Sequence, residues 1–176
     1  MKNIAVEYKD YCDNVSKYGH PMSLESVKWL VEYINADGSI KRVADFGSGF
    51  SSFAIRKYCP NVTNNSYDTD SRWLKKTEEY LRKEGVNTDN LHYYDRNFPT
   101  DFDLIVWDLQ GSGFRRTEFL AIKERFENSI CIIDDCHDPS YIQMCRDLAA
   151  NDGWELTEVK EVTDEFGRYV SILRRP

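Results

Sequence analysis

Acidic residues recur in this chain at the points where short apolar stretches end. The positions are Asp45, Asp68, Asp95, Asp108 and the pair Asp134-Asp135. A carboxylate can bind hydroxyl groups, take a proton as a general base, or ligate a hard cation. If the apolar stretches are parallel strands, their carboxyl ends share the sheet edge where open α/β sheets bind ligands. The spacing therefore predicts one acidic, ligand-binding edge.

A glycine-rich turn follows the first of these acids, in Asp45-Phe46-Gly47-Ser48-Gly49-Phe50-Ser51-Ser52. Glycines let the backbone turn tightly and approach a ligand closely. A dinucleotide-binding loop has a third glycine where this chain has Ser52, and it directs a helix N-terminus at a pyrophosphate. Asp45 would repel a pyrophosphate but suits an ammonium or sulfonium group. The turn therefore favours a cationic nucleoside over a dinucleotide.

The elements that must position these residues alternate between strands and helices. The hydrophobic pattern predicts strands at 42–46, 62–67, 91–94, 102–107, 129–133, 154–162 and 168–174. It predicts helices at 24–36, 51–58, 71–84, 116–126 and from Pro139 to about residue 151, with Ser23 and Asp138 as N-caps. Residues 1–22 are expected to be irregular, and Gly111-Ser112-Gly113 a flexible loop. The fold class is α/β, a mostly parallel seven-stranded sheet with an antiparallel C-terminal hairpin.

Composition narrows the functional classes. The chain has 176 residues with 30 acidic and 23 basic side chains, a net charge of −7, and this negative charge disfavours a nucleic-acid partner because it repels phosphate. Its five cysteines form no CxxC motif, as expected for reduced thiols. Without a signal peptide or an apolar run of about 20 residues, the expected protein is cytoplasmic and binds no membrane. We expect one domain, 23–176, preceded by a lid or substrate segment, 1–22.

The turn and the acids together resemble the class I S-adenosylmethionine-dependent methyltransferases, over roughly residues 20–176. That family has a Rossmann-like sheet with an antiparallel last strand. The resemblance implies that Asp68 binds the ribose hydroxyls of S-adenosylmethionine and that Asp95 lies near the adenine amino group. The implied cofactor-binding residues are Asp45, Gly47, Ser48, Gly49, Ser51, Ser52, Asp68, Asp95 and Asp108.

The remaining acids resemble the site of metal-dependent, catechol-type O-methyltransferases. Asp108 and Asp134 match the two aspartates of that family, whereas Asp135 stands where asparagine is usual. The resemblance implies Mg or Ca held by Asp108, Asp134 and Asp135. The alternative is a metal-free site in which Asp108, Asp134 or His137 is the catalytic base. That family often has a lysine near the acceptor, and no lysine of this chain can be matched to it. The loop after Asp108 offers Gln110 and Arg115 or Arg116 instead.

The sequence leaves little room for a separate recognition domain, so the expected acceptor is a small molecule, methylated on oxygen. Its pocket would be built from residues 1–22 and the loops 109–116, 136–141 and 163–167, and a homodimer could complete it. The expected walls are aromatic: Phe50, Trp107, Phe114, Tyr141 and Phe166. Two other functions remain open, a nucleotide-dependent oxidoreductase and a non-catalytic module that binds S-adenosylmethionine or a nucleotide.

Overall fold

The computed structural model describes residues 3–17 and 20–176. The helices are α1 (Ile4–Asn14), α2 (Leu24–Ala36), α3 (Phe50–Tyr58), α4 (Ser71–Lys83), α5 (Ser112–Ile122) and α6 (Pro139–Asn151), with 3-10 turns at Lys123–Phe126 and Lys160–Val162. The strands are β1 (Arg42–Phe46), β2 (Thr63–Asp68), β3 (Leu91–Tyr93), β4 (Leu104–Trp107), β5 (Ile130–Ile133), β6 (Glu155–Val159) and β7 (Val170–Arg174).

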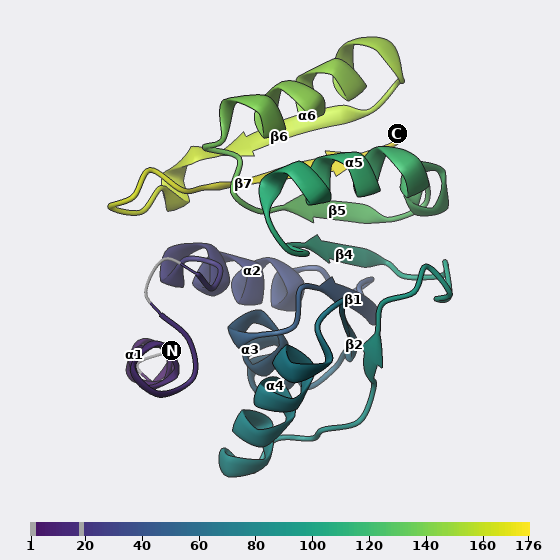
Figure 1. Ribbon diagram of the computed structural model, residues 1–176. Coiled ribbons are helices and arrows are strands. Elements are labelled where there is room, and N and C mark those ends of the chain that lie inside the picture. The colour runs from purple at the N-terminus through teal and green to yellow at the C-terminus, as the bar shows by residue number, and fades with distance from the viewer. Residues whose placement is uncertain (1–2, 18–19) are drawn as a thin grey trace.

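The seven strands form one sheet in the order β3-β2-β1-β4-β5-β7-β6 (Figure 1). Neighbours from β3 to β5 pair in parallel, and β7 lies antiparallel between β5 and β6. The order reverses between β1 and β4, so a crevice opens beyond their carboxyl ends. The predicted α/β fold class, with its mostly parallel seven-stranded sheet and C-terminal hairpin, is confirmed.

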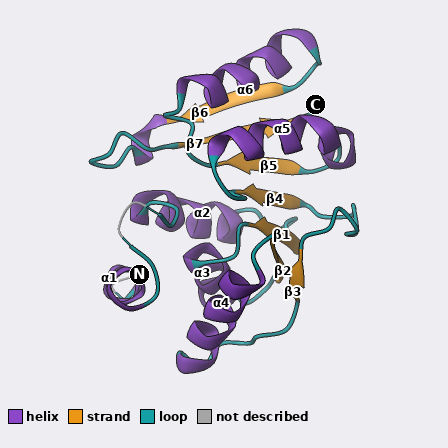
Figure 2. Ribbon diagram, viewed as in Figure 1, coloured by secondary structure: helices purple, strands orange, loops and turns teal. Residues whose placement is uncertain are grey.

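Helices cover both faces of this sheet (Figure 2). Apolar side chains of α1 to α4 pack in one cluster, which includes Val43 of β1. Those of α5 and α6 pack in a second cluster, which includes Ala44 and Phe46 of the same strand. Successive residues of a strand point to opposite faces. The strands therefore fill both layers of the core with consecutive apolar residues.

Two of the predicted helix starts are confirmed by their caps. The Ser23 hydroxyl accepts a hydrogen bond from the backbone N–H of Ser26, at 3.1 Å. The Asp138 carboxylate accepts from the N–H groups of Ser140 and Tyr141, and Pro139 occupies the first turn. Such side chains satisfy N–H groups that the first turn of a helix leaves without partners.

The connection from β3 to β4 contains no helix, and its aromatic residues pack on the sheet instead. Tyr94, Phe98 and Phe102 are buried. The Phe98 ring lies 5.0 Å from that of Phe46 and 6.0 Å from that of Phe126, between ring centroids. The sequence pattern predicts no helix between the strands at 91–94 and 102–107; this is confirmed, and aromatic side chains pack there instead.

Two predictions about local structure are wrong. Residues 1–22 are not irregular throughout, because Ile4–Asn14 form helix α1, with Ile4, Tyr8, Tyr11 and Cys12 buried. The Gly111-Ser112-Gly113 segment is not a loop, since Gly111 caps α5 and the helix begins at Ser112. No helix among the described residues is long and apolar enough to cross a membrane.

Candidate functional site

The turn after β1 is pressed against the backbone that follows β4. Gly47 has a φ of +104°, and a Cβ atom placed on it would lie 2.2 Å from the carbonyl oxygen of Asp108. The N–H of Gly47 donates to the carbonyl of Tyr67, at 2.8 Å, and the N–H of Asp108 donates to that of Phe46, at 2.7 Å. Only glycine fits this close approach and this left-handed conformation. The ends of three adjacent strands are thereby held together.

Asp68, the last residue of β2, is fixed to the glycine turn. Its carboxylate accepts the N–H and hydroxyl of Ser48, at 3.0 and 3.1 Å, and the N–H of Asp70, at 2.9 Å. Burial raises the pKa of Asp68, while these hydrogen bonds lower it. A carboxylate can accept about four hydrogen bonds, so it retains room for a ligand hydroxyl. Gly47 and Asp68 therefore belong to one site, as the sequence predicted.

Asp45 lies behind the turn. It is fully buried, and it accepts hydrogen bonds from the hydroxyls of Ser51 and Ser52 in the first turn of α3. Burial raises the pKa of Asp45 to about 6, and the hydrogen bond from Ser52 is the largest influence that lowers it. The structure therefore does not bring Asp45 or Ser52 to the cavity surface that the sequence analysis expected; both fix the start of α3.

A cavity of about 510 Å³ opens in front of the turn. Its lining residues come from the N-terminal segment, from the ends of β1, β2, β4 and β5, and from α3, α4 and α5. They are Tyr11, His20, Pro21, Met22, Gly47, Ser48, Gly49, Phe50, Ser51, Asp68, Thr69, Asp70, Trp73, Asp108, Gln110, Gly111, Arg115 and Asp135. Volumes of 300–1,000 Å³ are typical of small-molecule sites. Six of the predicted cofactor-binding positions thus meet at one cavity: Gly47, Ser48, Gly49, Ser51, Asp68 and Asp108.

The N-terminal segment contributes residues that the sequence analysis missed. The Tyr11 hydroxyl is buried, finds no hydrogen-bond partner among the described residues, and lies 3.3 Å from the Cβ position of Gly49. Trp73 of α4, which the sequence analysis also missed, donates from Nε1 to the carbonyl of Ser48 at 2.5 Å. The helical spacing of Ile4, Tyr8, Tyr11 and Cys12 was the available signal for α1. Tyr11 therefore brings an unused polar group to the cavity.

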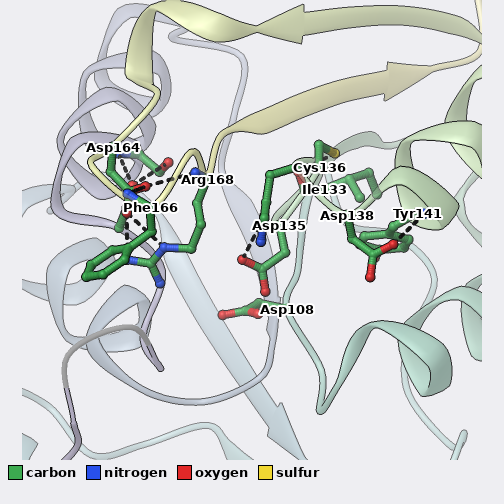
Figure 3. Close-up of polar contacts among 12 residues, drawn as sticks. Asp108, Ile133, Asp135, Cys136, Asp138, Tyr141, Asp164, Phe166 and Arg168 are labelled. Carbon is green, nitrogen blue, oxygen red and sulfur yellow. Dashed lines mark hydrogen bonds and ion pairs between the residues drawn. The ribbon is translucent and has the colours of Figure 1, made fainter.

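The C-terminal hairpin holds this segment in place. Arg168 donates from Nη1 to the carbonyl of Pro21, at 3.0 Å, and its Nη2 lies 2.7 Å from the Asp164 carboxylate. Pro21 and Met22 line the cavity, and the next residue, Ser23, caps α2 as predicted. Figure 3 shows Asp164, Phe166 and Arg168 grouped to one side of Asp108 and Asp135.

The acids after β4 and β5 converge at the other end of the cavity. One carboxylate oxygen from each of Asp108, Asp134 and Asp135 lies within 4.8 Å of the others. Arg115 joins two of them, with Nη2 2.8 Å from Asp108 Oδ1 and Nη1 2.9 Å from Asp135 Oδ2. Asp135 adopts a φ of +55°, and Figure 3 shows its carboxylate directed toward Asp108. The predicted acidic edge is present, with a guanidinium bound to it.

Two of these carboxyl groups, those of Asp108 and Asp134, have raised pKa values and so hold a proton more tightly than exposed ones. Burial raises the pKa of Asp134 to about 7, with repulsion from Asp135 adding to the effect and Arg115 opposing it. Burial also raises the pKa of Asp108 well above its ordinary range, although its ion pair with Arg115 lowers it. Carboxyl groups with a pKa near neutrality suit proton transfer at neutral pH.

Other predicted site residues lie outside the cavity lining. Asp95 is exposed, and its carboxylate accepts the N–H of Asn97. Asp134 is buried behind Asp108 and Asp135, and the His137 Nδ1 lies 3.7 Å from Asp135 Oδ1 with 39% of the side chain exposed. Trp107 and Tyr141 are wholly buried in the core, so they are wrong as pocket walls. Of the five predicted aromatic walls, Phe50 lines the cavity.

Comparison with solved structures identifies the architecture. The SAH-bound methyltransferase PaMTH1 of Podospora anserina superposes with a TM-score of 0.74 and 13% identity, over 100% of this chain and 88% of that one. This chain has the class I methyltransferase fold. Scans against protein-family models and curated sequences find no match.

Two further proteins with the class I methyltransferase fold differ in the chemistry their names give. The O-methyltransferase TomG of Streptomyces achromogenes, in complex with SAM, has a TM-score of 0.66 and 14% identity, over 98% of this chain and 88% of that chain. A precorrin-6y C5,15-methyltransferase of Geobacter metallireducens has a TM-score of 0.68 and 13% identity, over 94% of this chain and 96% of that chain. The class I methyltransferase fold is thus shared by proteins with different acceptors.

Replacing Gly47 tests the close approach between the β1 turn and the β4 backbone. We expect Gly47→Ala to lower the free energy of unfolding by about 3 kcal/mol or more, because the new methyl group meets backbone atoms and φ is left-handed. Urea unfolding measures the change. Gly113→Ala is the matched control, since a Cβ there has open space inside helix α5, and it should be neutral or stabilising by up to about 1 kcal/mol. Equal effects of the two substitutions would contradict the close approach.

The buried Asp45 carboxyl predicts a pH dependence of stability. Its folded-state pKa of about 6 exceeds the ordinary value of 3.8, so between these values the folded protein binds this proton more tightly than the unfolded chain. Its stabilising contribution is therefore present at low pH and lost as pH rises from about 4 to 6. Between pH 4 and pH 7, wild type should lose about 2 kcal/mol relative to Asp45→Asn in urea unfolding. Parallel stability curves for the two proteins would refute this.

Proposed function

We propose that this chain is a methyltransferase that uses S-adenosylmethionine to methylate a small-molecule acceptor, on oxygen. The observation that carries the proposal is the pair of hydrogen bonds from Ser48 of the glycine turn to Asp68, which places a buried carboxylate beside the backbone of that turn. Proteins of the same fold include SAM- and SAH-bound methyltransferases. The alternatives, a nucleotide-dependent oxidoreductase and a non-catalytic binding module, lack a comparable observation in their favour.

The residues of the cavity fit this donor. Asp68 retains acceptor capacity for the ribose hydroxyls. The Cβ position of Gly49 lies beside the cavity residues Tyr11 and Trp73, so the missing side chain there leaves the backbone open to close contact with a ligand. The unpartnered hydroxyl of Tyr11 is a further polar group at the cavity. A diphosphate has less support, because the acidic residues Asp68, Asp70, Asp108 and Asp135 all line this cavity.

The acceptor would bind at the acidic end. When bound, S-adenosylmethionine supplies both the methyl group and the leaving group, so the chain needs only to orient the acceptor and remove its proton. Asp108 lines the cavity with a raised pKa and is our proposed base. Asp134, close behind it, would share the proton, and the half-exposed His137 beside Asp135 would pass it to water.

A divalent cation is the alternative means of activating an acceptor hydroxyl. Three carboxylates favour Mg or Ca by ligand type, and Asp108, Asp134 and Asp135 lie close enough together. Arg115, however, already bridges two of the three. The arrangement therefore does not fit a metal without displacement of this side chain, and we assign no step to one.

Binding of the donor is tested by calorimetric titration. We expect S-adenosylmethionine and S-adenosylhomocysteine to bind one per chain, and Asp68→Ala to weaken both at least tenfold, about 1.4 kcal/mol. Asp147→Ala, which removes the same charge from the exposed face of α6, should leave the affinity unchanged. Unaltered affinity in Asp68→Ala would count against the ribose contact, and tighter binding of NAD would favour an oxidoreductase.

Methyl transfer is tested by mass spectrometry with a panel of phenols, carboxylic acids and amines. We expect a mass gain of one methyl group on a hydroxyl-bearing member of the panel, and loss of at least 90% of that activity in Asp108→Asn. Donor binding without any methylated product across the panel would favour the non-catalytic module, and methylation of amines alone would contradict the oxygen acceptor.

A further inference from the structure

The acidic edge carries its own cation. Asp108, Asp134 and Asp135 crowd three carboxylates together, and such groups repel one another unless a positive charge lies between them. The Arg115 guanidinium is in contact with two of them, at 2.8 and 2.9 Å. An arginine stays charged in proteins, and its planar fork binds carboxylates in fixed geometry.

Arg115 is held in this position from several sides. Its Nε donates to the carbonyl of Gln110 at 2.8 Å, and its own carbonyl accepts from Trp107 Nε1 at 3.2 Å. The residue is only 6% exposed. Gln110 and Asp135, which present oxygen atoms to it, both adopt left-handed backbone conformations, with φ of +56° and +55°. Such conformations persist where the surrounding structure enforces them, so the local chain is shaped around this guanidinium.

The carboxylate at position 135 is part of the same arrangement. It departs from the asparagine that the catechol-type resemblance implies, and it is the group that Arg115 Nη1 contacts. A divalent cation on these carboxylates would share their oxygens with Arg115 and be repelled by it. If the cation displaced Arg115, the guanidinium, whose side chain is 7% exposed, would lose both ion pairs, which is costly for a buried charge.

We infer that Arg115 is the resident cation of this site, occupying the place that three convergent carboxylates would otherwise offer to a divalent metal. The site therefore binds no Mg or Ca with useful affinity. Arg115 is a positioning residue: its two ion pairs fix the direction of the Asp108 and Asp135 carboxylates, which face the cavity. The claim that the site does not bind Mg or Ca stands by itself. The further claim, that acceptor methylation needs no metal, rests on the proposed function.

The test is binding of Mn²⁺, a spectroscopic probe for Mg sites, followed by electron paramagnetic resonance in the full chain. Wild type should show no saturable binding up to about 1 mM. Arg115→Gln and Arg115→Met should each gain a site that binds at least tenfold more tightly, and adding Asp108→Asn should abolish it. Arg116→Met, which removes a charge from the exposed neighbouring position, should behave as wild type.

Stoichiometric Mn²⁺ binding by wild type that Asp108→Asn removes would overturn the inference, and so would folded Arg115 variants that gain no site. Thermal melting identifies variants that fail to fold. If neither Arg115→Gln nor Arg115→Met folds, Mn²⁺ binding by wild type decides the inference. Once a methylated product is known, its rate in EDTA should match the rate with added Mg within about twofold. Dependence of that rate on Mg would refute metal-free transfer, while absence of any product would refute the proposed function and leave the Mn²⁺ result standing.

Discussion

The close approach of Gly47 to the backbone of Asp108 is the constraint on which the site depends. The two chain segments touch because the glycine has no Cβ, and a methyl group there would lie 2.2 Å from a carbonyl oxygen. This contact places the β1 turn directly beside the end of β4. Ser48 then reaches Asp68 at the end of β2, so one turn positions both the proposed ribose-binding carboxylate and the proposed base.

Electrostatics impose the second constraint. Five aspartates, at positions 45, 68, 108, 134 and 135, lie near one crevice, and their charges are stabilised in more than one way. Asp45 and Asp68 are satisfied by serine hydroxyls and backbone N–H groups. Asp108 and Asp135 share Arg115. Burial raises the pKa of Asp134 to about 7, although the charge of Arg115 and a backbone hydrogen bond from Asp135 lower it. The crevice is thus acidic without being uniformly anionic.

The sequence predicted the strands and the edge they share because an apolar run ending in an acid is a local pattern. It could not place every acid correctly. Asp45 was expected to face the ligand, yet in β1 it shares a face with Val43 and therefore points toward α3. That alternation was readable in the sequence. Asp95 follows a three-residue strand, and its direction depends on the loop that turns back over the sheet.

Arg115 and Tyr11 were harder to identify because their positions depend on helix boundaries. The choice between Arg115 and Arg116 requires the register of α5, which begins at Ser112 and not at the predicted residue 116. Tyr11 requires α1, whose polar and aromatic composition concealed a buried stripe of helical period. Arg115 also contacts Asp135, which lies 20 residues further along the chain, and Tyr11 lies beside Gly49 of the glycine turn, so the packed structure is needed to bring these residues to the cavity.

The central claim is that the crevice between the glycine turn and Asp68 binds a cationic nucleoside donor at an acidic edge neutralised by Arg115. The most direct measurement is a crystal structure grown with S-adenosylhomocysteine and Mn²⁺, with anomalous data collected at the manganese edge. The account predicts the nucleoside in this crevice, its ribose hydroxyls within hydrogen-bond distance of the Asp68 carboxylate, and no manganese peak at Asp108, Asp134 and Asp135. A nucleoside bound elsewhere, or a manganese ion among these three carboxylates, would contradict it.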